Sequence, residues 1–359
     1  MTQAHDLLAR TLRESAGALA AYAAHDLLAA RPEAGKAYGP SSAAGWRGFL
    51  AKRLADLAAA AAAGEPALFA SQIRWARTAF RARGVPVEDL RAAVEALQAV
   101  LERELPEATR RVAREYLGAA IPALEGAGDA SAPALEPDTP ERRLALAYVL
   151  ALLEGDSRRA MALVLDAARD GRPVRDLYQD VLMPAMAETG RMWLVGEACV
   201  AEEHFITATT ASLVHRLMAG AEAAPANGKT AVVASVEGNR HDLASQMLAN
   251  LLELAGWRVV RLGADVPVLE VVVAVRAFEA DCLLLSASLV TQVEAVGQTV
   301  REVRASAGGQ GVKIVVGGAA LDAVPQLAER LGADACDRGV GEAVAMAGRL
   351  VGLSTTPSP

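Results

Sequence analysis

One stretch in the C-terminal third of the chain constrains the fold most strongly. Residues 230–236 form an apolar, valine-rich run that is typical of a buried strand. A loop, residues 237–240, leads to His241 at the start of a helix that runs to about Ala255. A second apolar run, residues 257–262, follows. A strand, loop, helix and strand of this length predict one βαβ unit of an open parallel sheet.

His241 is the first candidate for a ligand-binding side chain. Ligands of open parallel sheets bind at the carboxyl ends of the strands, and His241 follows the first strand. Two alternatives remain. His241 could simply cap the helix, or the unit could bind a nucleotide, although the Gly-x-Gly-x-x-Gly fingerprint of that site is missing here.

The stretch resembles the cobalamin-binding domain shared by methionine synthase, corrinoid methyltransferase proteins and cobalamin-dependent light sensors. That family carries Asp-x-His-x-x-Gly, and this chain has Asn-Arg-His-Asp-Leu-Ala at residues 239–244. The resemblance implies that His241 is the lower axial ligand of cobalt. It also implies a wider set of cofactor-binding residues around the loop and around the dimethylbenzimidazole tail: Asn239, Arg240, Asp242, Leu243, Ser286, Ser288, Leu289, Gly317 and Gly318.

The departures from the family motif have physical consequences. A metal-bound imidazole usually donates its other ring proton to a neighbouring acceptor. Asn239 stands where the family has Asp. Its side-chain oxygen can still accept a hydrogen bond from that ring N–H, but it lacks the full negative charge of a carboxylate. We expect a less basic imidazole and a weaker bond to cobalt.

Residues 141–222 predict four helices, which match the helical cap before the cobalamin domain in the same family. Trp193, Glu203 and His204 resemble the Trp-x9-Glu-His signature of adenosylcobalamin-dependent photoreceptors, where these residues line the upper face around the 5′-deoxyadenosyl group. The alternative is that Trp193 is a core residue and Glu203-His204 a surface pair. Leu194 stands where light-sensing repressors carry a second histidine.

Residues 1–125 predict helix throughout, arranged as a bundle or a globin-like fold of four to six helices. Three arginines are expected on a stripe beside the apolar face of one helix: Arg74, Arg77 and Arg81. Such a stripe is either a solvated face or a site for carboxylates, such as the propionates of a bilin. No cysteine lies in this region, so a bilin would be held non-covalently.

Composition argues against a nucleic-acid-binding protein and against a membrane-spanning one. The net charge is −7 and 22% of residues are charged, so a nucleic-acid partner is not expected. The chain has no membrane-length apolar run, and its three cysteines have no metal-ligand spacing, which favours a cytoplasmic location. Residues 126–140 and 223–229 are expected linkers, and residues 354–359 a disordered tail.

The sequence therefore predicts a multi-domain protein. An all-α domain, residues 1–125, precedes the cap and a Rossmann-like parallel-sheet domain at residues 230–353. Domain order resembles photocobilins, which pair cobalamin with a bilin. We expect a non-enzymatic light sensor that holds adenosylcobalamin, with biliverdin as a second chromophore, and that signals through a light-dependent homo-oligomer to an unknown downstream protein. The alternatives are a corrinoid carrier for methyl transfer and a light-insensitive cobalamin-binding adaptor.

Overall fold

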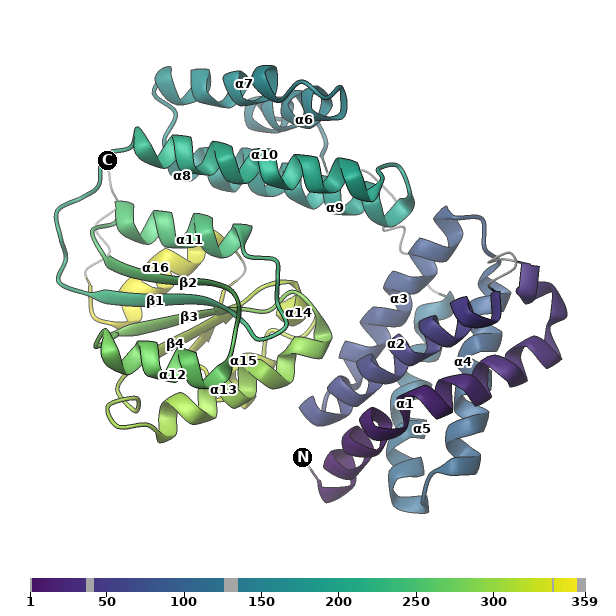
Figure 1. Ribbon diagram of the computed structural model, residues 1–359. Helices are drawn as coiled ribbons and strands as arrows, with labels where there is room; N and C mark the ends of the chain where they lie inside the picture. The colour runs from purple at the N-terminus through teal and green to yellow at the C-terminus, as the bar shows by residue number, and fades with distance from the viewer. Residues whose placement is uncertain (1, 37–41, 126–134, 338, 354–359) are drawn as a thin grey trace. The chain divides into compact units, whose positions relative to one another are not determined.

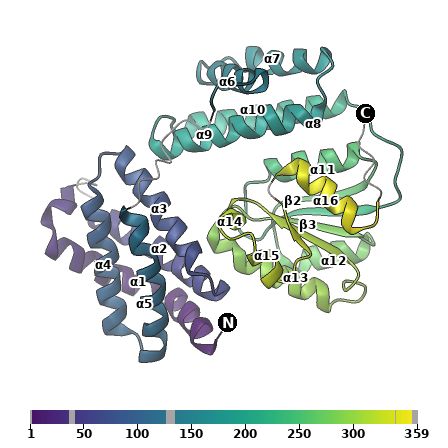
Figure 2. The same ribbon diagram turned by 180° about the vertical axis from the view of Figure 1, so that it is seen from behind.

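The computed structural model describes residues 2–36, 42–125, 135–337 and 339–353. The chain divides into two compact units, residues 1–131 and 132–359 (Figures 1 and 2). Most of the expected linker at residues 126–140, and all of the expected tail at residues 354–359, lie outside the described residues. Among the helices of these ranges, none combines the length and the hydrophobicity of a membrane-spanning segment.

The N-terminal unit is all-α, as predicted. Its long helices are α1 (Gln3–Ala30), α2 (Ser42–Ala63), α3 (Pro66–Ala82), α4 (Val87–Glu104) and α5 (Glu107–Glu125), with the short η1 (Pro32–Lys36) after α1. Pro66 opens α3, where its missing N–H costs no hydrogen bond, and the Glu65 carboxylate accepts a hydrogen bond from the first turn. Buried leucine, alanine and aromatic side chains fill the space between the helices.

The predicted arginine stripe on α3 is wrong at one of its three positions. Arg74 and Arg81 are exposed, but Arg77 is only 3% exposed. Four residues advance an α-helix by about 400°, which returns Arg77 to roughly 40° from Ile73. Ile73 is fully buried, so Arg77 falls inside the apolar arc of the helix rather than beside it.

The C-terminal unit begins with the four-helix cap. Its helices are α6 (Pro140–Leu153), α7 (Ser157–Arg169), α9 (Met183–Val195) and α10 (Val200–Ala219). The third of these is entered through α8 (Val174–Asp176) and a π-helical turn, η3 (Leu177–Leu182). Thr139 and Asp156 cap α6 and α7 with side-chain oxygens, which fixes where each helix begins.

The second part of this unit is a five-stranded parallel sheet with the strand order β2-β1-β3-β4-β5. The strands are β1 (Thr230–Val236), β2 (Arg258–Val266), β3 (Cys282–Ser286), β4 (Lys313–Gly317) and β5 (Ala335–Cys336). Each residue of β1 is buried, as expected for a central strand covered on both faces. The predicted fold class is confirmed.

Helices cover both faces of the sheet. On one face lie α11 (Leu243–Leu254) and α16 (Val340–Leu350), and on the other lie α12 (Val268–Ala277) and α13 (Val293–Ala305) (Figures 1 and 2). Three short helices complete the connections: η4 (Val290–Gln292), α14 (Ala319–Asp322) and α15 (Leu327–Arg330).

The cap packs against the α11 face of the sheet domain through a continuous apolar core and a few polar contacts. The Tyr178 hydroxyl donates to the carbonyl of Val214 and accepts from Asn250 Nδ2 at 3.0 Å, and burial raises the pKa of Tyr178 to about 12. Gln246 Nε2 lies 3.2 Å from the His215 ring. These contacts place the end of the cap over the first helix of the sheet domain.

Candidate functional site

The strand order creates a switch point between β1 and β3. The chain leaves β1 for β2 on one side and returns to β3 on the other, so the loops after β1 and β3 diverge at the carboxyl edge. Open parallel sheets bind their ligands in the crevice at such a point. His241 lies in the loop after β1, and Ser286 ends β3, so two sequence-predicted site residues flank the switch point.

A row of four residues crosses this edge of the sheet, three of them in neighbouring strands and the fourth directly after β5. Ser235 pairs with Ser286, and Ser286 pairs with Gly317. Asp337 continues the row, because Cys336 pairs with Val316 and the backbone N–H of Asp337 donates to the Val316 carbonyl. Residues in register on parallel strands point to the same face. We call Ser235, Ser286, Gly317 and Asp337 the polar row.

The polar row faces α11. Ser235 is fully buried, and its hydroxyl lies 3.2 Å from the hydroxyl of Ser245 in the first turn of that helix. Ser286 and Asp337 are partly exposed. The row therefore begins inside the protein beneath the His241 loop and runs outward across β3, β4 and the end of β5.

Asn239 fixes the His241 loop across the switch point. Its carboxamide is fully buried, and its Nδ2 donates to the Ser286 carbonyl at 3.0 Å. Its Oδ1 accepts the backbone N–H of His241 at 3.1 Å. We expected this oxygen to accept the imidazole proton; in the structure it bonds the His241 backbone instead, because the loop turns directly after Asn239.

Two further residues hold this loop, and sequence reasoning did not find them. The Asp265 carboxylate accepts the Gly238 N–H at 2.7 Å, and the Asp265 N–H donates to the Asn239 carbonyl at 2.8 Å. Gln292 donates from Nε2 to the Gly238 carbonyl at 2.9 Å. Its Oε1 accepts the N–H groups of Ser288 and Leu289 at 2.8 and 2.9 Å. Gln292 thus joins the loops after β1 and β3.

His241 itself is exposed at the end of this braced loop. Its neighbours differ in their surroundings. Arg240 is exposed, Asp242 forms an ion pair with Arg261 at 3.3 Å, and the half-buried Leu243 packs on the core. Leu289, in the facing loop, is 45% exposed. The imidazole is therefore accessible, while Asp242 and Leu243, which follow it, are held by an ion pair and by packing.

Gly317 and Gly318 leave bare backbone beside the loops. Gly318 has φ of +99°, and a Cβ there would collide with the carbonyl group of Ala287. A Cβ at Gly317 would lie 2.6 Å from the Asp337 Cγ. A side chain is therefore excluded at Gly318, whereas at Gly317 it would have to displace the Asp337 carboxyl group. The groups that this edge offers to a ligand are the exposed imidazole of His241 and the partly exposed Ser286, whereas the Ser235 hydroxyl is buried against Ser245.

Asp337 is the polar-row residue with the most unusual chemistry. Burial raises the pKa of its carboxyl to about 7, and the charges of Asp322 and Glu342 raise it further, against a hydrogen bond from the Gly339 backbone. The carboxyl group fills the space over Gly317 that a side chain would take. Sequence reasoning missed this residue, because only the register of β5 brings it into the row.

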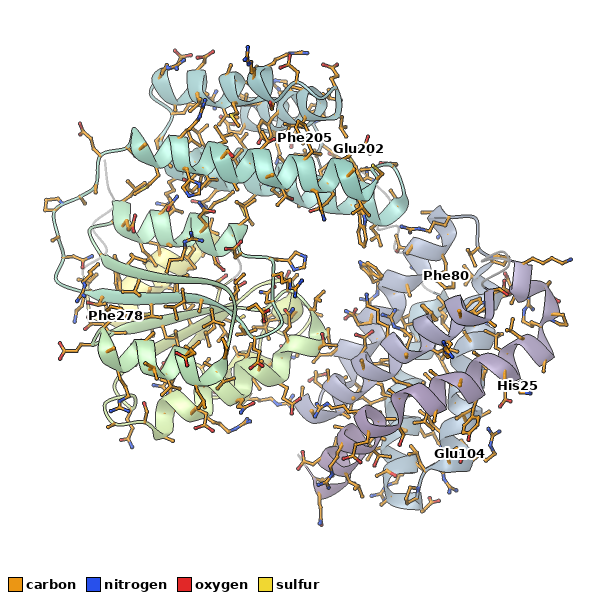
Figure 3. All side chains as sticks on the ribbon, in the orientation of Figure 1. His25, Phe80, Glu104, Glu202, Phe205 and Phe278 are labelled. Atoms are coloured by element: carbon orange, nitrogen blue, oxygen red, sulfur yellow. The ribbon has the colours of Figure 1, made fainter. Side chains whose placement is uncertain are left out.

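The cap residues of the predicted upper face lie where α9 ends and α10 begins. Trp193 is 38% exposed, and Glu203 and His204 follow the N-terminus of α10, where Figure 3 marks Glu202 and Phe205. Glu203 binds His204 Nδ1 at 2.6 Å and accepts from Thr207 at 2.9 Å. Leu194, near the end of α9, is buried.

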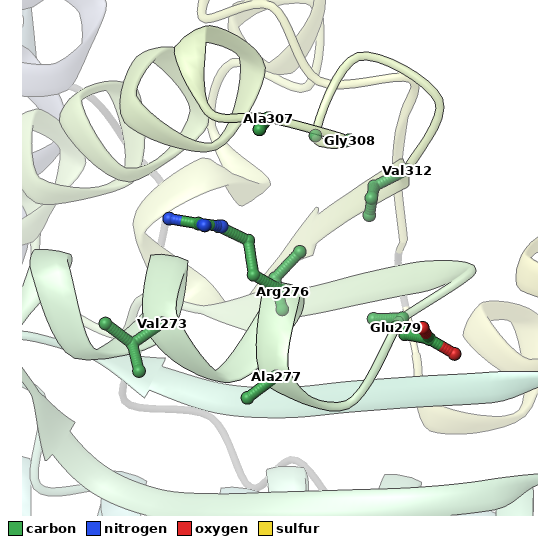
Figure 4. A pocket seen from close by; sticks show the side chains of 10 residues that line it. Val273, Arg276, Ala277, Glu279, Ala307, Gly308 and Val312 are labelled. Atoms are coloured by element: carbon green, nitrogen blue, oxygen red, sulfur yellow. The ribbon is translucent and has the colours of Figure 1, made fainter.

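A hollow of about 760 Å³ lies at the amino-terminal edge of the sheet, opposite the edge that carries His241 (Figure 4). The end of α12 and the loop before β4 line it, with Arg276 and Glu279 as its charged groups. No residue of the polar row or the His241 loop reaches it. Among the described residues, no group of three or more His, Cys, Asp or Glu side chains could hold a metal ion.

Comparison with known proteins assigns the class. Residues 229–347 and residues 144–218 each match a family model described as a B12 binding domain. The cap and the sheet domain are therefore the two halves of a cobalamin-binding module, and the chain is a cobalamin-binding protein.

The individual relatives are corrinoid proteins of Methanosarcina. Dimethylamine corrinoid protein 2 of Methanosarcina acetivorans is 32% identical over 117 residues, which are 33% of this chain and 53% of that protein. Dimethylamine corrinoid protein 3 of the same organism is 27% identical over 194 residues, 52% of this chain and 89% of that protein. With the first of these, the chain spans about half of the relative's length. The monomethylamine corrinoid protein of Methanosarcina barkeri has the same fold, with a TM-score of 0.52 at 20% identity over 58% of this chain and 98% of that one.

These relatives overturn the predicted function. A light sensor was expected from the Trp193, Glu203 and His204 signature, but the matching proteins are corrinoid proteins named for methylamines. They agree with the alternative, a corrinoid carrier. Binding of cobalamin is confirmed. Biliverdin was expected at Arg74, Arg77 and Arg81 as the second chromophore of a light sensor. Without a light sensor, that expectation has no basis. The adenosyl group and the homo-oligomer stay predictions.

Proposed function

We propose that this protein is a corrinoid carrier, which holds cobalamin between its cap and its sheet domain and passes methyl groups to and from partner methyltransferases. It is a carrier rather than an enzyme in its own right. The similarity to dimethylamine corrinoid proteins supports this role, because it extends through both the cap and the sheet domain.

The observation that carries the proposal is the presentation of His241. An exposed imidazole stands at the switch point of the sheet, on a loop that Asn239, Asp265 and Gln292 hold by hydrogen bonds. A ligand held on such a braced loop keeps its geometry while the group on the other side of the metal changes. A carrier needs this property, because it must retain its cofactor through repeated gain and loss of a methyl group.

When it is bound, cobalamin supplies a cobalt centre that accepts a methyl group from a donor and gives it up to an acceptor. His241 would hold the lower axial position. Asn239 would keep the His241 backbone fixed through its Oδ1. Gln292 would hold the loop after β3 in place by accepting the Leu289 N–H. The chain's own contribution is orientation of the corrinoid and exclusion of water.

The cap edge suits the other side of the corrinoid. Three large apolar side chains are exposed at the end of α9 and the start of α10: Trp193, Val200 and Phe205. Apolar side chains can shield a methyl group from water without holding it by hydrogen bonds. Because they are exposed, they could also contact a partner that reaches the same face.

The test is methylation of the bound cofactor in darkness. The full chain is loaded with aquocobalamin, desalted and reduced to the cob(I)alamin state. It is then mixed with dimethylamine and the dimethylamine methyltransferase of Methanosarcina acetivorans, and with trimethylamine or monomethylamine pairs in parallel. We expect the cob(I)alamin spectrum to convert to that of methylcob(III)alamin with one of these pairs.

Iodomethane serves as the chemical positive control, since it methylates any accessible reduced cobalt. Methylation by iodomethane together with no methylation by any methyltransferase pair would contradict a carrier of this substrate class. Omitting the methylamine from an active pair should abolish the conversion.

A further inference from the structure

Helix α12 carries an apolar stripe on its outer side. Leu269 is 67% exposed and Val273 is 56% exposed, and the exposed Ala277 continues the stripe to the end of the helix. These residues recur every four positions, so each lies only about 40° round the helix from the one before. Single exposed apolar residues are common, but a continuous stripe is typical of a surface that binds another protein. The stripe therefore indicates a docking surface.

The stripe ends beside the hollow at the amino-terminal edge of the sheet. Val273, Arg276 and Ala277 line one side of this hollow, and Ala307 and Gly308 line the other (Figure 4). Helical residues spaced by three and four positions enclose a hole that can receive one side chain from a facing helix. The small methyl group of Ala277 leaves this hole open. The hollow therefore has room for a side chain as large as that of leucine.

The same helix thus presents both a knob and a hole. Leu269 lies four residues before Val273, and Ala277 lies four residues after it. If a second α12 crosses the first in the opposite direction at Val273, each Leu269 lies over the hole of the other copy. A surface that carries both halves of a contact at equal distances from its centre is self-complementary, which is what a twofold interface requires.

We propose that two copies of this chain associate through α12, antiparallel and about a twofold axis at Val273. Each Leu269 then packs against Val273 and Ala277 of the other copy. The aliphatic part of Arg276 covers the leucine while its guanidinium group stays in water. A second copy is the occupant that supplies a knob for the hole and a hole for the knob in one contact. This inference goes beyond methyl transfer and does not depend on it.

The charges beside the stripe fit the same arrangement. Glu270 is exposed near the start of α12, and Arg258 of β2 stacks on Phe278 at the other end, with its guanidinium carbon 5.9 Å from the ring centroid. Glu270 and Phe278 are eight residues apart, which is about 80° beyond two full turns, so both lie on the flank toward β2. An antiparallel pairing brings the start of one helix to the end of the other. Glu270 of one copy therefore approaches Arg258 of the other, and this contact occurs twice.

The size of the stripe sets the expected strength of the dimer. A helix of 10 residues is about 15 Å long, so two such helices bury less than the roughly 800 Å² per partner of a standard interface. Interfaces at this end of the range form weak, transient complexes. We therefore expect a dimer that dissociates in the micromolar range.

The first experiment measures the mass of the full chain by sedimentation equilibrium over a range of concentrations. The wild-type protein should pass from the mass of one chain to that of two. Leu269→Glu removes both knobs at once, because the interface is twofold, and should raise the dissociation constant about a hundredfold. Leu150→Glu is the matched control, since it changes a leucine of α6 that is 49% exposed, and it should leave the association unchanged. Far-UV circular dichroism and cobalamin uptake show whether each variant is folded.

Cysteine cross-linking tests the register of the two helices. Cys199, which is exposed, is first changed to Ser. Val273→Cys lies at the proposed axis, so its two Cα atoms should come within the roughly 4.4–6.8 Å that a disulfide spans and form a covalent dimer under mild oxidation. Leu269→Cys is the control. Its two copies lie eight residues of helix rise apart, about 12 Å, and should not cross-link.

Charge reversal tests the flank toward β2. Glu270→Arg and Arg258→Glu should each weaken the dimer by up to about tenfold, because the contact occurs twice. The double variant restores opposite charges, so its dissociation constant should return to the wild-type value.

A single-chain mass at every concentration, up to the highest that stays in solution, would overturn the proposal. An unchanged dissociation constant in Leu269→Glu would place the contact elsewhere and overturn it as well. Cross-linking through Leu269→Cys but not through Val273→Cys would contradict the antiparallel register. None of these measurements uses a methyl donor, so such results would leave the carrier function untouched.

Discussion

The two surfaces that would face a corrinoid are built in opposite ways. At the sheet edge, hydrogen bonds join residues far apart in sequence: Asn239 reaches Ser286, and Gln292 reaches Gly238. At the cap edge, Glu203 contacts His204 and Thr207 of its own helix. Buried polar groups that bridge separate loops fix those loops, whereas local contacts on an exposed helix leave the side chains able to rearrange.

This difference indicates a division of labour. Hydrogen bonds within the protein hold the loops of the sheet edge, so binding there requires little further ordering of them. The cap edge carries exposed Trp193, Val200 and Phe205, whose positions a ligand or a partner can still change. A carrier benefits from both, because one side of its cofactor stays fixed while the other exchanges groups.

The largest effect is expected at His241. His241→Ala removes the one imidazole on the braced loop, so the bound cobalamin should lose its histidine ligand altogether. The absorption spectrum, and the nitrogen splitting in the electron paramagnetic resonance spectrum of the cob(II)alamin form, report this ligand. His25→Ala, which removes an exposed histidine from α1, is the control and should keep both signatures. Retention of the nitrogen splitting of a protein imidazole in His241→Ala would remove His241 from the metal.

The next effect tests the bracing itself. Gln292→Ala leaves two N–H groups and one carbonyl without their partner, and Gln292 is only 4% exposed. We expect the free energy of unfolding to fall by about 2–4 kcal/mol. Urea unfolding of the apoprotein measures it. Gln298→Ala, on the exposed side of α13, should change stability by less than about 0.5 kcal/mol. Equal values for the two variants would mean that the loops are not held by Gln292.

A smaller effect, with a defined pH dependence, is expected at Asp337. Its pKa rises from 3.8 to about 7 on folding, so the native state keeps the proton where the unfolded chain has lost it. Stability should therefore fall as pH rises from 3.8 to about 7, relative to Asp337→Asn, which does not titrate. Because the side chain is partly exposed, we expect a relative change of about 1 kcal/mol. Parallel stability curves for the two proteins would contradict the raised pKa.

The smallest effect is expected at the cap edge. Glu203→Ala removes two contacts within one exposed helix end, and such changes shift stability by about 0.5 kcal/mol or less. Thermal or urea unfolding of the apoprotein measures the change. A loss above about 1 kcal/mol would show that the cap edge is held as firmly as the sheet edge, and the contrast between the two surfaces would disappear.

The sequence predicted the parts of the site that follow one another along the chain. The strand before His241, the loop and the helix after it are a local pattern, and the structure has each of them. Arg77 was misplaced, because an arginine was assumed to face solvent although its helical position lies close to Ile73. Local rules worked where burial follows residue type and failed where it does not.

Asp337 and Gln292 could not be found in this way. Their roles depend on which strands are neighbours and in what register, and β5 is two residues long with little apolar signal of its own. Asn239 shows the same limit in a milder form. Its position near His241 was predicted, but its bond to Ser286 depends on the packing of β3 beside β1.

The polar row also bears on how such a protein changes over evolutionary time. Its positions are not independent of their neighbours: the Asp337 carboxyl stands over Gly317, and the Ser235 hydroxyl lies 3.2 Å from that of Ser245 in α11. A change at Gly317 or at Asp337 therefore alters the space left to the other residue, and we expect these two positions to vary together among relatives of this chain.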